Sequence, residues 1–188
     1  MAEILDAAAG VFADVGYERA TTNAIAAAAG ISPGSLYQFF PNKEAITEAL
    51  ADRFVSQMRD AHENAFTGVN FARIGLDELL DRVVDPILRF NTANPGFKAI
   101  FARPDMPTGL TTAAQSIQAA LLGRVEAILA ARAPGQPAAE RSRSARVAIQ
   151  IFQAMVPLVV AADDAERPAV TVELKKVLRG YLEPIIGR

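Results

Sequence analysis

The sequence of 188 residues contains no cysteine, no tryptophan and a single histidine, His62. Without cysteine, the chain cannot form a disulfide scaffold, a cysteine-ligated zinc finger or a thiol nucleophile. One histidine cannot build a His-rich metal site or supply two catalytic imidazoles. The sequence also contains no Gly-rich phosphate loop and no G-x-S-x-G turn. We therefore expect no metal, no cofactor and no enzyme, although carboxylates alone could still support catalysis.

Long apolar runs are missing as well. The longest, residues 154–162, has 9 residues, whereas a bilayer span needs about 20. No basic segment followed by an apolar run at the start of the chain resembles a signal peptide. Hydrophobic residues make up 51% of the chain, too many for a disordered acidic protein. We expect a soluble, globular, cytoplasmic protein with no membrane partner.

Positive charge is scarce in the N-terminal quarter. The whole chain has a formal net charge of −2, but residues 1–50 carry only Arg19 and Lys43 against six acidic residues, a net charge of −4. By charge alone, this segment should repel DNA.

Helical spacing of apolar residues, by contrast, runs through almost the whole chain, and no clean alternation of period two is found. Gly16 and Gly30 are natural helix stops, while Thr21 or Thr22, Ser32 and Asn42 are suitable N-caps. The pattern predicts an all-α fold of about nine helices: 2–15, 22–29, 33–40, 43–66, 73–92, 95–102, 110–132, 138–162 and 168–186. The segment 68–70 is the clearest break between two domains.

The second and third of these helices form a predicted helix-turn-helix. Gly30 permits a tight turn, Ile31 fills the space between the helices, and Leu36 faces the core. Residues 35 and 37–39 are left on the outward side of the second helix, with short polar side chains and a bare helix N-terminus that suit a major groove. Backbone N–H groups at the two helix starts could meet phosphate oxygens without any side-chain charge.

Many further positions stand in one register with this motif: Ile4-Leu5-Asp6-Ala7-Ala8, Phe12, Gly16-Tyr17, Thr21-Thr22, Ile25-Ala26, Ala29-Gly30-Ile31-Ser32, Gly34-Ser35-Leu36-Tyr37, Phe40 and Lys43-Glu44. With these residues, segment 4–50 resembles the DNA-binding domain of the TetR family of bacterial transcriptional regulators. The resemblance implies a helix-turn-helix DNA-binding domain at 1–48 and a ligand-binding and dimerisation domain at 49–188. It further implies a homodimer that binds double-stranded operator DNA as a repressor and is released by a small-molecule effector.

Carried over by position, the resemblance assigns DNA contacts to eight residues: Thr22, Ser32, Pro33, Gly34, Ser35, Tyr37, Gln38 and Lys43. Tyr37 could instead be an aromatic at the edge of the core. The chain departs from the family in two ways. No basic residue precedes the first helix, and Phe39 stands where histidine or tyrosine is frequent. Phe39 could contact a thymine methyl group or be packed inside.

For the C-terminal domain, the resemblance suggests a pocket near the sixth helix, and the apolar composition there suggests a small, largely apolar effector. The expected ligand-binding residues are Phe90, Phe97, Phe101, Met106, Gln118, Gln150 and Gln153. An effector among the fourth to eighth helices would tilt the fourth and move the recognition helices. The last two helices are expected to form a four-helix dimer interface through Ile149, Phe152, Val156, Val159, Leu174, Leu178, Tyr181 and Leu182.

Several alternatives stay open. Asp77, Asp81 and Asp85 share one helix face, with Glu78 beside them, and could bind a cation. The simpler interpretation is a solvated face on which Arg82 pairs with Glu78 and Arg89 pairs with Asp85. Gln150 and Gln153 could bond to each other instead of a ligand, and His62 could be an ordinary surface residue. The competing function is a helical ligand-binding dimer whose helix-turn-helix no longer binds DNA. The sequence does not separate a repressor from an activator.

Overall fold

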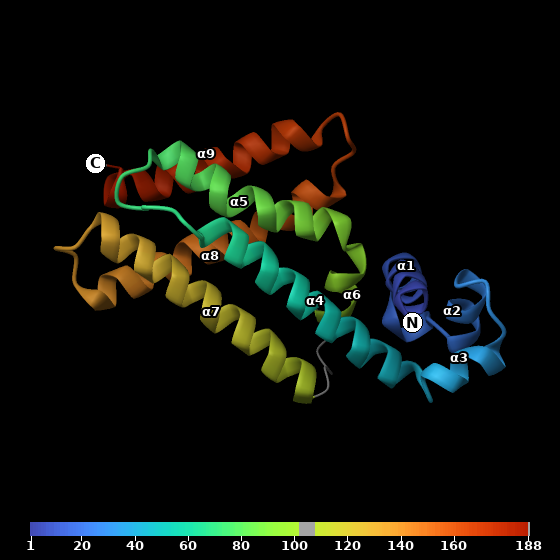
Figure 1. Ribbon diagram of the computed structural model, residues 1–188. Coiled ribbons are helices and arrows are strands. Elements are labelled where there is room, and N and C mark those ends of the chain that lie inside the picture. Colours follow the sequence, from blue (N-terminus) through green and yellow to red (C-terminus); the bar gives the residue numbers. More distant parts are fainter. Residues whose placement is uncertain (102–107, 188) are drawn as a thin grey trace. The chain divides into compact units, whose positions relative to one another are not determined.

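The computed structural model describes residues 1–101 and 108–187, and within them the chain is entirely helical. The fold class predicted from the sequence is confirmed (Figure 1). Nine helices are found in the described residues: α1 Ala2–Arg19, α2 Thr22–Ala28, α3 Pro33–Phe39, α4 Lys43–Phe66, α5 Leu76–Ala93, α6 Pro95–Phe101, α7 Thr108–Arg132, α8 Ala138–Ala161 and α9 Arg167–Ile186.

Local capping interactions explain why the N-terminal helices start where the sequence predicts. The side chain of Thr21 accepts a hydrogen bond from the Ala24 N–H at 3.1 Å, and that of Ser32 accepts one from the Ser35 N–H at 3.1 Å. Asn42 caps α4 in the same way through the Ala45 N–H, at 2.8 Å. Each cap satisfies an N–H that has no partner within its helix.

The largest difference from the expected helix ends is at the end of α1, whereas α5 begins at Leu76 and not at residue 73. α1 runs on to Arg19 as a single element, although Gly16 inside it has a non-helical backbone with φ of 76° and ψ of 162°. Glycine tolerates this positive φ because it has no Cβ. The predicted stop at Gly16 is therefore present as a break, after which the chain makes one more helical turn.

The chain divides into two compact units. The N-terminal unit comprises residues 1–58 and 93–116, and the C-terminal unit comprises residues 59–92 and 117–188. The division thus falls within α4, and α6 belongs to the N-terminal unit. The domain boundary expected at residue 48 stays a prediction.

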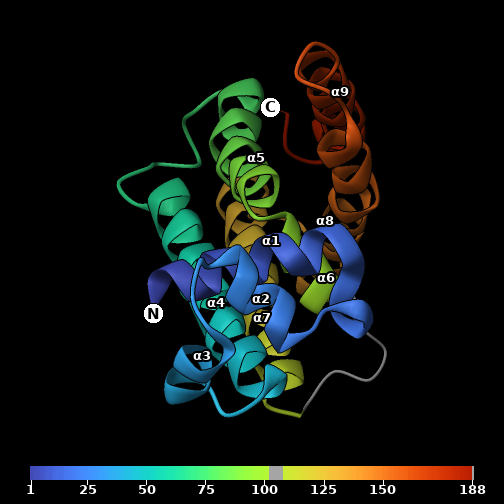
Figure 2. The same ribbon diagram turned by 90° about the vertical axis from the view of Figure 1, so that its right-hand side faces the viewer.

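In the N-terminal unit, α2 packs against both α1 and α3 (Figure 2). Its core includes Phe12, Ile25, Leu36 and Ile46, whose side chains are fully buried. α6 packs closely on α1, and Gly96 makes this possible: a Cβ built at Gly96 would lie 2.6 Å from the carbonyl oxygen of Ala9.

In the C-terminal unit, α5, α7, α8 and α9 share one hydrophobic core. Arg132, the last residue of α7, ties this unit together. Its guanidinium donates hydrogen bonds to the carbonyls of Ile186 at 3.0 Å, Phe71 at 3.0 Å and Ile74 at 2.6 Å. The end of α7 is thereby joined to the end of α9 and to the segment before α5.

Candidate nucleic-acid interface and apolar cavity

The turn between α2 and α3 has the geometry of a Schellman motif. Gly30 adopts a φ of 68°, the Ile31 N–H donates to the Ala26 carbonyl at 3.0 Å, and the Gly30 N–H donates to the Ala27 carbonyl at 3.1 Å. This pairing satisfies the last carbonyls of α2 and reverses the chain sharply. It sets α3 against α2, with Leu36 and Phe40 buried beneath it.

The opposite face of α3 is open to solvent. Tyr37 is 50% exposed and Phe39 is 52% exposed, and Gly34 and Gln38 are exposed beside them. The two aromatic side chains are therefore not core residues. Phe39 was expected either to contact a thymine methyl group or to be packed inside, and its exposure rules out packing within this chain. The exposed apolar ring of Phe39 is available for contact with a partner.

The structure brings Thr22 and Tyr37 together. Their hydroxyl groups share a hydrogen bond of 3.0 Å, which links the first residue of α2 to the outward face of α3. Ser32 and Ser35 also share a hydroxyl hydrogen bond, of 2.9 Å, at the start of α3. These hydroxyls form a neutral polar rim that can donate to phosphate oxygens.

Lys43, the eighth predicted DNA contact, points back into its own unit. Its ammonium group donates to the carbonyls of Tyr17 at 2.9 Å and Ala20 at 3.2 Å, and it lies 4.1 Å from the centroid of the Tyr17 ring. The Tyr17 hydroxyl in turn donates to Glu44 at 3.2 Å. Lys43 thus fastens the start of α4 to the end of α1, and its contact with phosphate stays a prediction.

The C-terminal unit contains a cavity of about 70 Å³ between α5, α7, α8 and α9. Every described residue that lines it is alanine, valine, isoleucine, leucine or phenylalanine. Ala148, Ile149 and Phe152 contribute the α8 side, and Leu178, Leu182 and Ile186 contribute the α9 side. α4 and α6, expected to surround the effector, contribute none of the described lining residues.

The predicted ligand-binding residues are not gathered at one site. Phe97 lies 4.6 Å from Phe101 and 5.8 Å from Phe54, ring centroid to ring centroid, in the N-terminal unit. Phe90 is buried, Gln118 is exposed, and Gln150 donates to Gln153 at 2.8 Å. None of these six residues lines the cavity. Met106 lies outside the described residues, as does the side chain of His62.

The residues predicted for the dimer interface mostly face the interior of their own unit. Val159, Leu174, Leu178 and Leu182 are buried core residues. Ile149 and Phe152 line the cavity, and Val156 and Tyr181 pack partly against the core. When a helix is apolar on all sides, its sequence does not show which side packs in the core of its own chain and which side faces outward.

The apolar surface that α8 and α9 do expose is a different one. It includes Leu158, Val172 and Val177, which are 59%, 50% and 46% exposed. By length and composition alone, α8 is long and apolar enough to cross a membrane, a property that it shares with core helices of soluble proteins. Val147, Gln150, Ala154 and Leu158 are exposed and follow one side of α8; we call these four residues, together with the exposed Val172 and Val177 of α9, the outer α8–α9 face.

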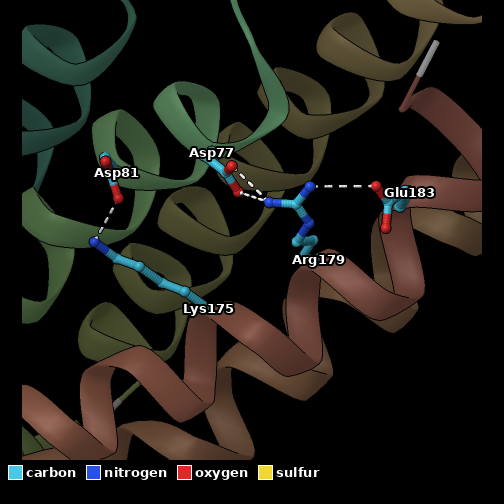
Figure 3. A network of polar contacts seen from close by, with 5 residues as sticks. All are labelled: Asp77, Asp81, Lys175, Arg179 and Glu183. Carbon is cyan, nitrogen blue, oxygen red and sulfur yellow. Dashed lines mark hydrogen bonds and ion pairs between the residues drawn. The ribbon is translucent and has the colours of Figure 1, made fainter.

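The acidic stripe of α5 has partners that the sequence analysis missed. Lys175 of α9 pairs with Asp81 at 2.7 Å and with Asp85 at 2.6 Å, and Arg179 pairs with Asp77 (Figure 3). Arg82 forms an ion pair with Glu78 at 3.6 Å, as expected. The spacing of Lys175 and Arg179 matches that of the aspartates, a signal that could have predicted this pairing. The stripe therefore joins two helices, and the described residues form no metal-binding cluster.

Two family models match the chain. Residues 4–50 match the model of bacterial regulatory proteins of the tetR family, and residues 75–182, more than half of the chain, match the Tetracyclin repressor-like C-terminal domain. The chain belongs to the TetR family. TetR-family proteins are DNA-binding transcriptional regulators and not enzymes, so both the recognition of the family and the expectation of a non-enzyme are confirmed. Members bind operator DNA and small-molecule effectors and form dimers.

Known TetR-family structures share this fold. A TetR-like regulator from Rhodococcus sp. RHA1 superimposes with a TM-score of 0.75 at 23% identity, covering 95% of this chain and 93% of the other. A TetR-family regulator from Streptomyces coelicolor has a TM-score of 0.58 at 26% identity, with 98% of both chains covered.

Curated relatives match a smaller part of the chain. The A-factor receptor protein of Streptomyces griseus is 44% identical over 62 residues, 33% of this chain and 22% of the receptor. The chain spans less than half the length of the curated relatives it matches.

Proposed function

We propose that this TetR-family regulator is a homodimeric cytoplasmic repressor that leaves its operator when a small, largely apolar effector binds its C-terminal unit. The observation that carries the proposal is the open face of α3. There Tyr37, Gln38 and Phe39 point to solvent while Leu36 anchors the helix in the core. The second half of a helix-turn-helix exposes such a face for the major groove.

Neutral groups carry the contacts on this face. The hydroxyls of Thr22 and Tyr37 hold each other at 3.0 Å, and each keeps further hydrogen-bonding capacity for a phosphate oxygen. Gln38 can present its amide to a base edge, with adenine the best match for a bidentate contact. Ser32 and Gly34 bring backbone N–H groups, and Ser32 and Ser35 bring hydroxyls, close to the DNA backbone, while Pro33, which has no N–H, begins the helix beside it.

DNA retardation tests this assignment. An operator is first selected with the unmodified protein from the regulator's own upstream DNA or from a random duplex library. Gln38→Ala is then expected to lower operator affinity about 5–150-fold, the value of one good base contact, and to relax sequence preference at one position. Gln57→Ala, an exposed glutamine in the same unit, serves as the matched control and should leave binding unchanged.

Two results would reject the assignment. Unaltered sequence preference in Gln38→Ala would remove this face from DNA recognition. A protein that retards no DNA even at low salt would favour the second candidate function, a ligand-binding dimer that does not bind DNA. The net charge of −4 in residues 1–50 and the inward-facing ammonium group of Lys43 both motivate that candidate.

For the dimer, we propose a two-fold contact through the outer α8–α9 face. Exposed apolar side chains on two neighbouring helices are typical of an interaction site, and the small Ala154, one turn before Leu158 on α8, lets helices approach closely. Ala154→Glu is expected to convert the dimer to monomer in sedimentation analysis. Ala119→Glu, an exposed alanine on α7, should leave the dimer intact, and a dimeric Ala154→Glu would place the interface elsewhere.

The direction of regulation is tested by transcription from the operator-bearing promoter in vitro. Added protein should lower transcript yield, whereas a rise would identify an activator. The name of the A-factor receptor protein says that this relative is a receptor, which supports a ligand-responsive regulator. Its ligand is not transferred to this chain, because the match covers 22% of that protein.

A further inference from the structure

One of the exposed side chains on α3 is a phenyl ring. Phe39 is 52% exposed, and among the phenylalanines whose side chains the structure describes it is the only exposed one. Phe12, Phe40 and Phe54, three others of the same unit, are 0%, 5% and 0% exposed. A ring gains from the removal of its apolar surface from water. For Phe39, this gain is left to a binding partner.

Phe39 and Tyr37 flank Gln38 on the outward face of α3. Successive residues of an α-helix are turned by about 100°, so residues 37 and 39 point to opposite flanks. Tyr37 leans toward α2, where its hydroxyl shares a hydrogen bond with that of Thr22. Phe39 therefore lies on the other flank, one turn after Ser35. Because α3 has seven residues, it is about 10 Å long, and a major groove about 12 Å wide takes in the whole helix.

The segment that carries Phe39 brings no charge to DNA. Residues 20–42 contain no acidic or basic side chain, and Lys43, which follows them, donates to the carbonyls of Tyr17 and Ala20. A phenyl ring has no N–H or O–H group with which to bind a phosphate oxygen. An apolar surface pressed on that oxygen would strip it of water without replacing the lost hydrogen bonds, which is unfavourable. Phe39 can therefore strengthen DNA binding only through apolar contact.

The edges of the bases in the major groove offer one apolar group to such a ring. They present hydrogen-bond donors and acceptors, and thymine alone adds a methyl group, at C5. A ring that covered donors or acceptors would leave them without partners. A ring that covers the methyl group removes two apolar surfaces from water at once. The methyl group is thus the part of a base edge that fits Phe39.

We infer that Phe39 is a specificity-determining residue that recognises the C5-methyl group of a pyrimidine in the operator. The inference rests on the proposed function, since it takes the outward face of α3 as the DNA-binding surface. It goes beyond that proposal in naming a side chain and the chemical group that it reads. Thymine carries this group, and so does cytosine methylated at C5.

Replacement of thymine by uracil removes the methyl group and leaves the base pair otherwise unchanged. An operator is first selected with the unmodified protein, as described above. Each thymine of one half-site is then replaced in turn by deoxyuridine, and the Kd is measured by retardation at one salt concentration. At one position the Kd should rise about fourfold, the value of one buried methyl group.

Variants assign this response to Phe39. Phe39→Ala should bind the thymine operator more weakly and should lose the response to uracil, because the methyl group is then left uncovered with either protein–DNA pair; the two changes together form a double-mutant cycle. Phe39→Leu, which keeps an apolar side chain, should retain part of the response. Tyr37→Phe is the matched control on the opposite flank. It loses its hydrogen bond to Thr22 but should show the full response to uracil.

Methylated cytosine distinguishes the two sources of the methyl group. Cytosine and 5-methylcytosine are compared at the responsive position, each paired with guanine. A preference for 5-methylcytosine of about fourfold, absent from Phe39→Ala, would add this base to the groups that Phe39 recognises. A response to uracil without this preference would restrict the source to thymine.

Two results would overturn the inference. One is an operator that is indifferent to the loss of every thymine methyl group, and the other is an equal response to uracil in Phe39→Ala and in the unmodified protein. Either result leaves the proposed function intact, because the operator is still bound. An unmodified protein that retards no DNA rejects the proposed function, and the inference with it.

Discussion

A methyl group at position 96 would collide with the backbone of α1. A Cβ built on Gly96 lies 2.6 Å from the Ala9 carbonyl oxygen, 3.1 Å from its Cα and 3.2 Å from its carbonyl carbon. These are backbone atoms within a helix, so no side-chain rotation relieves the collision. An ordinary contact starts at 3.4 Å, so α1 and α6 would have to separate by about 0.8 Å.

The cost of Gly96→Ala follows from this separation. Overpacking a tight interior costs about 1–3 kcal/mol, and here the displaced atoms are backbone, which places the cost at the upper end. Alanine recovers at most about 0.5–1 kcal/mol through its higher helix propensity. We expect a net destabilisation of about 2 kcal/mol and a fall in Tm of about 4–8 °C for a chain of this length.

Gly10→Ala is the matched control for this prediction. Gly10 lies in α1 next to Ala9, and a Cβ there meets no atom within 4 Å. The same change of residue should therefore stabilise the protein by about 0.5–1 kcal/mol. Both variants and the unmodified protein are compared by thermal and urea unfolding at one protein concentration, because dimerisation makes the Tm concentration-dependent. A Gly96→Ala protein as stable as Gly10→Ala would refute the close approach of α1 and α6.

Three further predictions follow from named contacts. Arg132→Ala should lower stability by about 2–4 kcal/mol in urea unfolding, because three carbonyls lose a charged donor, and Arg132→Lys should recover less than half of the loss; equal stability of Arg132→Ala would remove its anchoring role. Partial burial disfavours the charge on Lys175, but its hydrogen bonds to Asp81 and Asp85 raise its pKa above 10.5. Its contribution to stability is thus complete below pH 10.5 and is lost as the pH rises through the raised pKa. Unfolding measured from pH 9 to 12 should therefore depend less on pH in Lys175→Met than in the unmodified protein, with Lys176→Met as control; equal slopes would contradict the ion pairs. Finally, with few cations at the interface, log K for operator binding should fall only shallowly with log salt concentration, and more steeply when a basic segment is added before Met1; a steep slope without it would show that cations placed elsewhere carry the phosphate contacts.

Local signals made the helix ends predictable. A hydroxyl or amide side chain at Thr21, Ser32 and Asn42 satisfies an N–H three residues later, and Gly30 supplies the positive φ that ends α2. These interactions lie within one turn of the chain, so the residues that make them are adjacent in the sequence. The residues of the helix-turn-helix also lie close together along the chain, so the motif and its resemblance to the TetR family could be recognised from the sequence.

The sequence by itself thus determined the all-α class, the order of the helices and which residues lie on the outward face of α3. Only the tertiary structure decided which residues far apart in the sequence contact one another. It turned Lys43 toward the carbonyls of α1, set Lys175 and Arg179 against the aspartates of α5, and directed Leu174 and Leu182 into the core. The type of a side chain, charged or apolar, indicates what kind of partner it needs. It does not indicate which residue that partner is, because the partner depends on how distant helices pack. For the same reason, the cavity and the outer α8–α9 face emerge only when the helices are assembled.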